Sequence, residues 1–356
     1  MKRVAVAAAL MAVSLGGACT AQTAHESATS MRQVRNVDGN LQVVEAAIPE
    51  PGAGQIRLRV LASSVNPFEM RGLAGTYGPS DVNPVMDEAP RNGPDPMAAM
   101  RITPGSDVAG IVDALGEGVT GFAVGDKVFG AARSFGGWAD YALTPAEETV
   151  AKPDNLTFEE AASIPTVGFA AVRTFNLANP KEGESVAIIG AAGGVGTILT
   201  QMTLARGAHV IAVASSRHED FLSALGADRF VAYDKVDVAQ EVKGVDLVIN
   251  TARGQSDIAL AYLREGGRFA SIAEEPSEAA CNAAGVDCLF RAGRPRSDNG
   301  GDAFRMLGDM AGRGALTLNV SSRYPLEQVG AALTELAEGH TQGKIVLDID
   351  PRAQER

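Results

Sequence analysis

A glycine-rich turn between two apolar segments contains the residue types that could bind a dinucleotide. The turn reads Ala191-Ala192-Gly193-Gly194-Val195-Gly196, which is the pattern G-x-G-x-x-G with alanine in the first place. A glycine at 193 leaves room for a pyrophosphate, and a glycine at 196 lets the following helix lie close to the sheet, where the free N–H groups at its start bind the anion. Plain packing turns in α/β proteins can have the same composition, so the prediction depends on a strand before the turn and a helix after it.

The residues after the next apolar run indicate which dinucleotide would bind. NAD sites usually carry Asp or Glu about 20 residues after the first glycine, where the carboxylate binds the ribose hydroxyls. Here the chain reads Ala214-Ser215-Ser216-Arg217, and no acidic residue comes before Glu219. Two hydroxyls and a guanidinium suit a 2′-phosphate, because arginine presents a planar fork of donors. We therefore predict NADPH as the cofactor; the alternative is that Arg217 is a solvated residue at a helix start.

The hydrophobic pattern around the turn predicts an α/β domain. Apolar runs at 185–190 and 209–214 flank a segment with helical spacing, which gives a strand, a helix and a strand joined by a right-handed crossover. Further apolar runs follow at 230–233, 245–250, 268–272 and 289–291. We expect a Rossmann doubly wound parallel sheet.

Short strands separated by glycine predict a different domain before this one. Strand patterns occur at 41–44, 55–60 and 104–112, and close glycine turns continue to residue 142. Such spacing favours a partly open β-barrel. Thr157 and Glu160 have the spacing of a capping box, which predicts a helix leading into the dinucleotide unit. The apolar run at 345–347 is expected to return to the first domain.

The length of 356 residues suggests two cores. We expect a signal peptide and tether at 1–30, a catalytic domain at 31–155, an NADP-binding domain at 156–298, and a C-terminal return to the catalytic domain at 299–356.

The first thirty residues resemble an export leader. Lys2-Arg3 precedes an apolar run at 4–18, which is too short to span a membrane comfortably but suits the core of a signal peptide. Cys19 lies in a degenerate lipobox and could be lipidated. We expect an exported protein, periplasmic or lipid-anchored, with any membrane tether at the N-terminus only. The alternative is a cytoplasmic protein that starts at Met31, where NADPH is available.

The composition excludes one class of partner. The chain is 46% hydrophobic and 21% charged, as in ordinary globular proteins, and its net charge is −12. Nucleic-acid binding depends on clustered Lys and Arg that neutralise phosphates. We therefore expect no nucleic acid as partner, and the predicted NADPH implies a small-molecule electron acceptor.

A set of short motifs, taken together and in order, resembles one family. The motifs are Ser64-Val65-Asn66-Pro67, Pro104-Gly105-Ser106-Asp107-Val108-Ala109-Gly110, Val124-Gly125-Asp126-Lys127-Val128-Phe129-Gly130, the glycine turn at 191–196, Leu225-Gly226-Ala227-Asp228, Gly266-Gly267-Arg268 and Gly343-Lys344-Ile345-Val346-Leu347. From Met31 onward the chain resembles the medium-chain dehydrogenase/reductase superfamily, in particular its zinc-independent quinone oxidoreductase-like branch.

The resemblance implies a GroES-like catalytic domain wrapped around the Rossmann domain, with the substrate cleft between them. It implies that Asn66 lies beside the nicotinamide and the substrate, Tyr233 beside the adenosine 2′-phosphate, and Lys344 near the cofactor. Tyr77, in a long insertion at 72–103, is our candidate proton donor or substrate anchor; the alternative is a tyrosine that only packs its ring. The insertion could be a lid or a variable surface excursion.

The residues also bear on metal binding. Zinc-dependent relatives have an early cysteine, and Gly-His-Glu where this chain has Gly105-Ser106-Asp107. The three cysteines, Cys19, Cys281 and Cys288, lie elsewhere and are too few for a four-thiolate zinc site. We expect no metal. Cys281 and Cys288 could pair in an exported protein, but we expect reduced packing cysteines.

These expectations lead to a reaction. Without a metal to polarise a carbonyl, alcohol oxidation is disfavoured, and we predict hydride transfer from NADPH to a quinone or an α,β-unsaturated carbonyl. Family members often have Gly-Leu-Thr-Ala-Tyr where this chain has Gly168-Phe169-Ala170-Ala171-Val172, so two hydroxyls are missing and Phe169 and Val172 suggest an apolar wall. This departure leaves open a non-catalytic NADPH-binding protein with a structural or sensing role. Relatives commonly dimerise through the Rossmann edge, so we expect a homodimer through 289–291.

Overall fold

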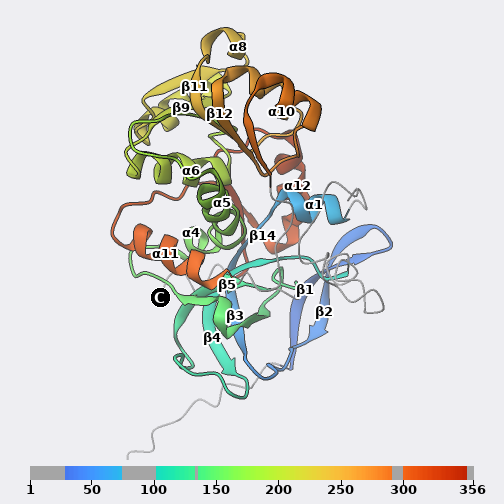
Figure 1. Ribbon diagram of the computed structural model, residues 1–356. Coiled ribbons are helices and arrows are strands. Elements are labelled where there is room, and N and C mark those ends of the chain that lie inside the picture. The colour runs from blue at the N-terminus through green and yellow to red at the C-terminus, as the bar shows by residue number, and fades with distance from the viewer. Residues whose placement is uncertain (1–28, 74–101, 133–134, 291–299, 351–356) are drawn as a thin grey trace, which may run out of the picture.

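The computed structural model describes residues 29–73, 102–132, 135–290 and 300–350, and these form two large sheets of different character (Figure 1). A parallel sheet lies in the upper half of Figure 1 and a mainly antiparallel sheet in the lower half, with helix α5 (Pro165–Ala178) between them. This confirms the predicted combination of a doubly wound parallel sheet with an antiparallel β-domain. The predicted leader up to residue 28, including Cys19, lies outside the described residues.

The upper sheet has six parallel strands in the order β10-β9-β8-β11-β12-β13. Their bounds are β8 Ser185–Ile189, β9 His209–Ala214, β10 Arg229–Ala232, β11 Val245–Asn250, β12 Leu263–Ser271 and β13 Asp287–Phe290. The strand order reverses direction between β8 and β11, and in such sheets ligands bind at the carboxyl ends of the strands at this point. The glycine turn at 191–196 follows β8 directly and therefore lies at that point.

The helices of the upper domain cover this sheet and continue to the C-terminal segment (Figure 1). The helices that follow or flank its strands are α5, α6 Gly194–Ala205, α7 Glu219–Ala224, α8 Val238–Glu241, α9 Ser256–Ala259 and α10 Glu278–Ala284. Three further helices, α4 Phe158–Ala162, α11 Gly301–Gly312 and α12 Val329–Glu338, contact strands of the lower sheet instead. The predicted capping box is confirmed at α4, where Glu160 N–H donates to Thr157 Oγ1 and Thr157 N–H donates to a Glu160 carboxylate oxygen.

The lower domain is built on a sheet with the strand order β14-β15-β3-β4-β5-β7, and β6 also pairs with β3. The bounds are β3 Gln55–Ser64, β4 Asp107–Leu115, β5 Lys127–Ala131, β6 Tyr141–Pro145, β7 Thr149–Ala151, β14 Val320–Pro325 and β15 Lys344–Asp348, with the short helix α1 at Pro67–Leu73. Val346 of β15 pairs with Ser64 of β3, which confirms the predicted return of the C-terminus to the first domain.

Some strands of the lower domain were not predicted, or were predicted only in part. Strands β1 (Ser30–Val37) and β2 (Asn40–Ala47) form a hairpin of their own, of which only part of the second strand was expected. Strand β14 was missed altogether, because its sequence VSSRYP has few apolar residues to mark it. This strand is stabilised by backbone hydrogen bonds to β15, with which it pairs in parallel, and its own side chains give no strand pattern.

One apolar core joins the two sheets. Val167, Ala171 and Phe175 on α5 belong to the same buried cluster as Val186 of the parallel sheet and Phe129 of the lower sheet. Since burial of such side chains contributes about 1.5–3 kcal/mol each, α5 fixes the two sheets relative to each other. The cofactor turn and the lower domain are thus held together by packing.

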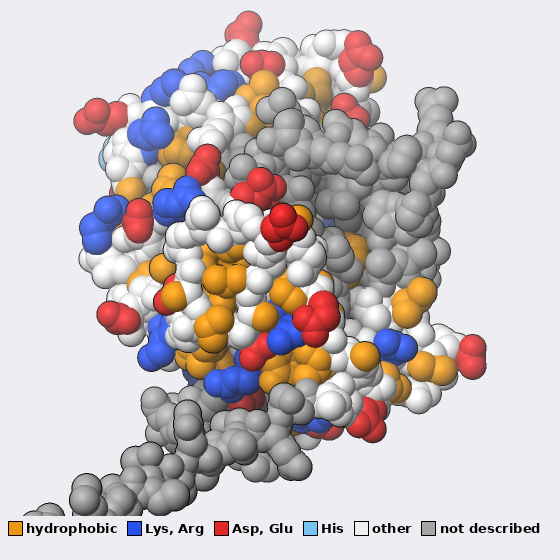
Figure 2. Space-filling model, turned by 90° about the horizontal axis from the view of Figure 1, so that it is seen from below, with side chains coloured by type: hydrophobic (Ala, Val, Ile, Leu, Met, Phe, Trp, Pro, Cys, Tyr) orange, Lys and Arg blue, Asp and Glu red, His pale blue; other side chains and the backbone are white. Residues whose placement is uncertain are grey.

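The surface of the described residues is mixed in charge. Figure 2, seen from below, shows acidic and basic side chains interspersed with apolar ones, without a continuous basic surface on the described part of this face. The absence of a nucleic-acid partner stays a prediction. Within the described ranges, none of the helices combines the length and the apolar character needed to cross a membrane.

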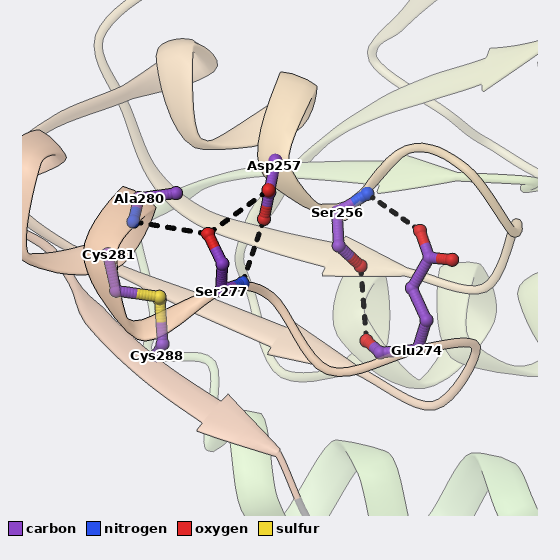
Figure 3. Close-up of a disulfide and its surroundings, with 7 residues drawn as sticks. All are labelled: Ser256, Asp257, Glu274, Ser277, Ala280, Cys281 and Cys288. Atoms are coloured by element: carbon purple, nitrogen blue, oxygen red, sulfur yellow. Dashed lines mark hydrogen bonds between the residues drawn. A yellow bond between two sulfur atoms is a disulfide. The ribbon is translucent and has the colours of Figure 1, made fainter. Parts of the chain in front are cut away.

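The expectation of reduced cysteines was wrong, because Cys281 and Cys288 form a disulfide (Figure 3). Cys281 lies on α10 and Cys288 on β13, the outermost strand of the parallel sheet. Ser277 is the N-cap of helix α10, and its hydroxyl accepts from Ala280 N–H and donates to Asp257. The helix ends at Gly285 in the left-handed conformation, with φ of 64°. This tight reversal brings the two Cα atoms to 6.2 Å, within disulfide range.

Reduction of this disulfide is expected to loosen the edge of the parallel sheet. The cross-linked loop is short, so its removal should lower the free energy of unfolding by about 2 kcal/mol. Urea unfolding with and without dithiothreitol measures the difference, and the variant carrying Cys281→Ser and Cys288→Ser serves as a control that should not respond to reductant. Alkylation of both thiols in denatured, unreduced protein would contradict the disulfide.

Candidate functional site

The glycine turn has the geometry of a dinucleotide-binding loop. Gly193 is the N-cap of α6, in extended conformation, and a Cβ on Gly196 would lie 2.2 Å from Gly190 O, so the close packing of helix on strand requires that glycine. A Cβ on Gly193 would approach nothing closer than Gly190 O at 3.5 Å, an ordinary contact. The protein's own packing therefore does not need a glycine at 193, whereas a pyrophosphate lying against the backbone would.

The C-terminal segment covers this turn from the other side. Gly343 N–H donates to Ala192 O at 2.8 Å, and Gly343 pairs with Gly193 in an isolated parallel bridge. Gly343 has φ of 79°, and a Cβ there would lie 2.2 Å from Asn319 O, so only glycine fits. Lys344 follows immediately, and its Cδ would lie 3.0 Å from a Cβ on Gly194. The predicted cofactor residues 191–196 and Lys344 therefore lie together.

Lys344 ends in a buried polar cluster at the junction of the two domains. Its Nζ donates to Val65 O at 2.8 Å and to Asn66 Oδ1 at 2.5 Å, and lies 3.8 Å from Asp107 Oδ2. Burial lowers the pKa of Lys344, while Asp107 and Glu69 oppose this shift. The structure thus brings the predicted residues Asn66 and Lys344 into direct contact, although 278 positions separate them.

Asn66 is fully buried and its amide is fully engaged in this cluster. Its Oδ1 accepts from Lys344, and its Nδ2 donates to Asp107 Oδ2 at 2.9 Å and to Glu69 Oε2 at 3.4 Å. Both the oxygen and the nitrogen of this amide already have partners within the protein. We therefore expect Asn66 to position Lys344, Asp107 and Glu69 and not to bind the substrate directly.

Sequence reasoning missed Glu69, the second buried carboxyl group of the cluster. It accepts from the N–H of Asn66 at 3.0 Å and from both the N–H and the hydroxyl of Ser106 at 2.8 Å. Burial, followed by repulsion from Asp107, raises the pKa of Glu69 to about 8, against the opposing effect of Ser106 and Lys344. The signal that could have found it is the spacing Asn66-x-x-Glu69, which is that of a capping pair at the start of α1.

The predicted 2′-phosphate residues lie at the carboxyl ends of β9 and β10. Ser215 is buried, Arg217 is exposed, and Tyr233 is 51% exposed, with its N–H donating to Ala214 O at 3.1 Å. The structure adds a carboxylate that the sequence did not place there. Ser216 N–H and Oγ donate to Asp234 at 2.6 and 2.7 Å, and these hydrogen bonds lower the pKa of Asp234 to about 2. Asp234 follows β10, which is parallel to β9, so the two strand ends meet at one edge.

The other predicted site residues are placed as follows. Phe169 and Val172 lie on α5, partly buried against the main core. Tyr77 and positions 74–101 of the insertion lie outside the described residues, so the proton donor or anchor assigned to Tyr77 stays a prediction.

Comparisons with known proteins agree with this architecture. Residues 52–154 match the family model of the alcohol dehydrogenase GroES-like domain, and residues 225–347 match that of a zinc-binding dehydrogenase. The solved structure of the quinone oxidoreductase from Coxiella burnetii superposes with a TM-score of 0.76 at 26% identity, covering 90% of this chain and 100% of that one.

Several curated relatives are named as oxidoreductases or reductases. Quinone oxidoreductase of Homo sapiens is 29% identical over 85% of this chain and 92% of its own length. The enzyme of the same name from Rattus norvegicus is 33% identical over 58% of this chain, and this match spans only 60% of the rat protein. A 2-methylene-furan-3-one reductase of Solanum lycopersicum is 29% identical over 62% of this chain and 55% of its own length.

The residues present do not fit the zinc ion that one family description names. The described part of the chain contains no group of three or more His, Cys, Asp or Glu residues able to hold a metal. At the domain junction, the carboxyl groups of Asp107 and Glu69 are hydrogen-bonded to Ser64, Asn66, Ser106 and Thr166, and the Lys344 ammonium lies beside Asp107. The buried Lys344 ammonium is thus already paired with Asp107, so this cluster does not fit a divalent metal ion.

The buried cluster predicts a pH dependence of stability. Because the pKa of Glu69 is raised in the folded chain, the folded state holds a proton that the unfolded state has lost, and the free energy of unfolding should fall as the pH rises from about 4.5 to about 8. The fall due to Glu69 should be up to about 5 kcal/mol, because each unit of pKa difference between the folded and unfolded states is worth about 1.4 kcal/mol. Urea unfolding over this range, compared with Glu69→Gln, isolates the effect of Glu69, and identical pH profiles for the two proteins would contradict it.

Proposed function

Because the chain belongs to the medium-chain dehydrogenase/reductase superfamily, with quinone oxidoreductase-like relatives, we propose that it reduces a quinone or an α,β-unsaturated carbonyl with NADPH and without zinc. The observation that carries this proposal is the buried contact between Lys344 and Asn66, which lies beside the glycine turn. Through this contact, a loop suited to bind a nucleotide lies next to a buried ionic cluster, and the described residues of that cluster include no His or Cys that could bind zinc.

The chain's own residues support nucleotide binding in three ways. The first turn of α6 presents N–H groups that lack partners within the helix, and Gly193 leaves the backbone open to a pyrophosphate. Gly343 holds the C-terminal segment against this turn. Arg217, exposed after β9, provides a guanidinium for the 2′-phosphate. These three features are the residues that we expect to bind NADPH.

The domain junction supports reduction of an electron-poor acceptor. NADPH, when bound, supplies a hydride, and an acceptor such as a quinone needs orientation and a proton more than it needs a Lewis acid. The Lys344 ammonium fixes Asn66, and through it the start of α1, against Asp107. The similarity to proteins named quinone oxidoreductase and 2-methylene-furan-3-one reductase supports an acceptor with a conjugated carbonyl.

The disulfide bears on the compartment. Disulfides persist mainly in oxidising compartments, and pairing of Cys281 with Cys288 was expected only for an exported protein. We therefore propose export, with the start at Met31 as the alternative. N-terminal sequencing of the natural protein, with cell fractionation, decides between them.

Turnover tests the proposed reaction. The purified protein should oxidise NADPH in the presence of small quinones or enones, with rates unchanged after treatment with a chelator, and the reduced acceptor should appear in equal amount. Loss of reduced nicotinamide absorbance and product analysis measure this. Tight NADPH binding without oxidation for any acceptor would favour a non-catalytic protein, and inactivation by the chelator would reject zinc independence.

Cofactor choice should depend on Arg217 and Asp234. Arg217→Glu should raise KM for NADPH roughly 10- to 100-fold, because it removes charge-assisted hydrogen bonds to the 2′-phosphate, while KM for NADH changes little. Asp234→Asn should lower KM for NADPH about two- to fivefold by removing a carboxylate beside Ser216. Lys243→Glu, which makes the same charge change just before β11, is the matched control for Arg217→Glu. Equal effects of Arg217→Glu on both cofactors would remove the role assigned to the guanidinium.

A further inference from the structure

Glu69 is the buried end of a chain of hydrogen-bonded groups. Its Oε1 lies 2.8 Å from Ser106 Oγ, Ser106 Oγ lies 3.2 Å from Thr166 Oγ1, and Thr166 Oγ1 lies 2.6 Å from Asp107 Oδ1. Glu69 is fully buried and Ser106 is buried, whereas Thr166 is only half-buried. This series of hydrogen-bonded groups therefore extends from the interior of the protein to the half-buried start of α5.

Each member of this chain can both accept and donate a proton. The pair of hydroxyls can be oriented either way, since either Ser106 or Thr166 can be the donor. When Glu69 is protonated, its O–H can donate to Ser106 Oγ, the Ser106 hydroxyl can donate to Thr166 Oγ1, and the Thr166 hydroxyl can donate to Asp107. A Thr166 hydroxyl that rotates away from Asp107 can then give its proton to an acceptor bound beside the start of α5.

The charges around Glu69 favour a stored proton. The charged groups that act on it are Asp107 from β4 and Lys344 from β15, while Asn66, Ser106 and Thr166 add only neutral groups. With Glu69 protonated, the carboxylate of Asp107 and the ammonium of Lys344 balance each other. With Glu69 ionised, the buried cluster carries one excess negative charge, which is costly in a low-dielectric interior.

The position of Thr166 connects the chain to the cofactor side. Thr166 follows Pro165 in the first turn of α5. The Cγ1 atom of the next residue, Val167, would lie 3.1 Å from a Cβ on Gly194 in the nucleotide-binding turn. The half-buried end of this hydrogen-bonded series, Thr166, is therefore close to the loop that holds the cofactor in the proposed function.

We propose that Glu69, Ser106 and Thr166 form a proton relay that supplies the proton consumed in the reduction. The inference rests on the proposed function. Hydride addition to the acceptor forms an enolate or a hydroquinone monoanion, and its oxygen or carbon takes the Thr166 hydroxyl proton. Thr166 is reprotonated by Ser106, and Ser106 by the Glu69 carboxyl group, which becomes a carboxylate. Solvent returns a proton to Glu69 after product release, so NADPH, one proton and the acceptor give NADP⁺ and the reduced acceptor.

The stored proton can be tested without turnover. Infrared difference spectra between acidic and alkaline protein should contain the C=O stretching band of a buried carboxylic acid that titrates near pH 8. The band should be absent in Glu69→Gln and shifted in Ser106→Ala. Absence of a Glu69-dependent band in the folded wild-type protein would overturn the relay, whether or not the protein turns over NADPH.

Proton delivery is tested during turnover. The wild-type kcat should decrease above pH 8 and show a solvent deuterium isotope effect, while Glu69→Gln and Thr166→Val should lower kcat about 10- to 100-fold with little change in KM for NADPH. Thr166→Ser, which keeps a hydroxyl, should restore most of the rate. Thr174→Val, a buried threonine on the same helix whose hydroxyl donates to Ala170 O, is the matched control. Full activity of Thr166→Val, or an unchanged alkaline decrease in Glu69→Gln, would overturn the relay while leaving the proposed reaction intact.

Discussion

The buried ammonium of Lys344 is the interaction on which the geometry of this molecule depends. It donates to the backbone at Val65 and to the side chain of Asn66, and it lies beside Asp107, so it joins β15 to the segment before α1 and to β4. Removing one partner of such a buried pair typically costs about 3–5 kcal/mol, since the other charge is left unpaired. Because Gly343 simultaneously holds the nucleotide-binding turn, one stretch of two residues aligns the lower sheet, the C-terminal strand and the Rossmann turn.

Local patterns in the sequence were sufficient for much of this fold. The glycine turn, the strands on either side of it and the capping box at Thr157 depend on residues close together in the chain, and all three are found as predicted. The closing strand was predicted from its apolar run and lies beside β3. The hairpin strand β1 and the polar strand β14 were missed, because pairing with a neighbour, and not a run of apolar residues, stabilises them.

The candidate site was less predictable, because its residues meet through the topology. Asp234 reaches Ser216 only because β10 lies parallel to β9, so a search along one strand end could not find it. Glu69 is spaced like an ordinary capping residue, which is usually exposed, and its burial follows from the packing of α1 near β4 and β15. The disulfide likewise depends on Gly285, whose left-handed turn folds Cys288 back onto α10.

The buried cluster and a metal ion would serve different kinds of substrate. A metal stabilises developing negative charge directly and needs no proton at that moment, which suits an unactivated carbonyl or alcohol. A protonated carboxyl group connected through hydroxyls offers little stabilisation until the acceptor has gained electron density, after which it can transfer a proton. Such a site is effective only when the acceptor is already electron-poor. Lys344 pairs with Asp107 and Glu69 beside them is neutral, so this cluster offers a proton but no strong positive charge to the acceptor. Such a site suits the electron-poor quinones and enones that we propose.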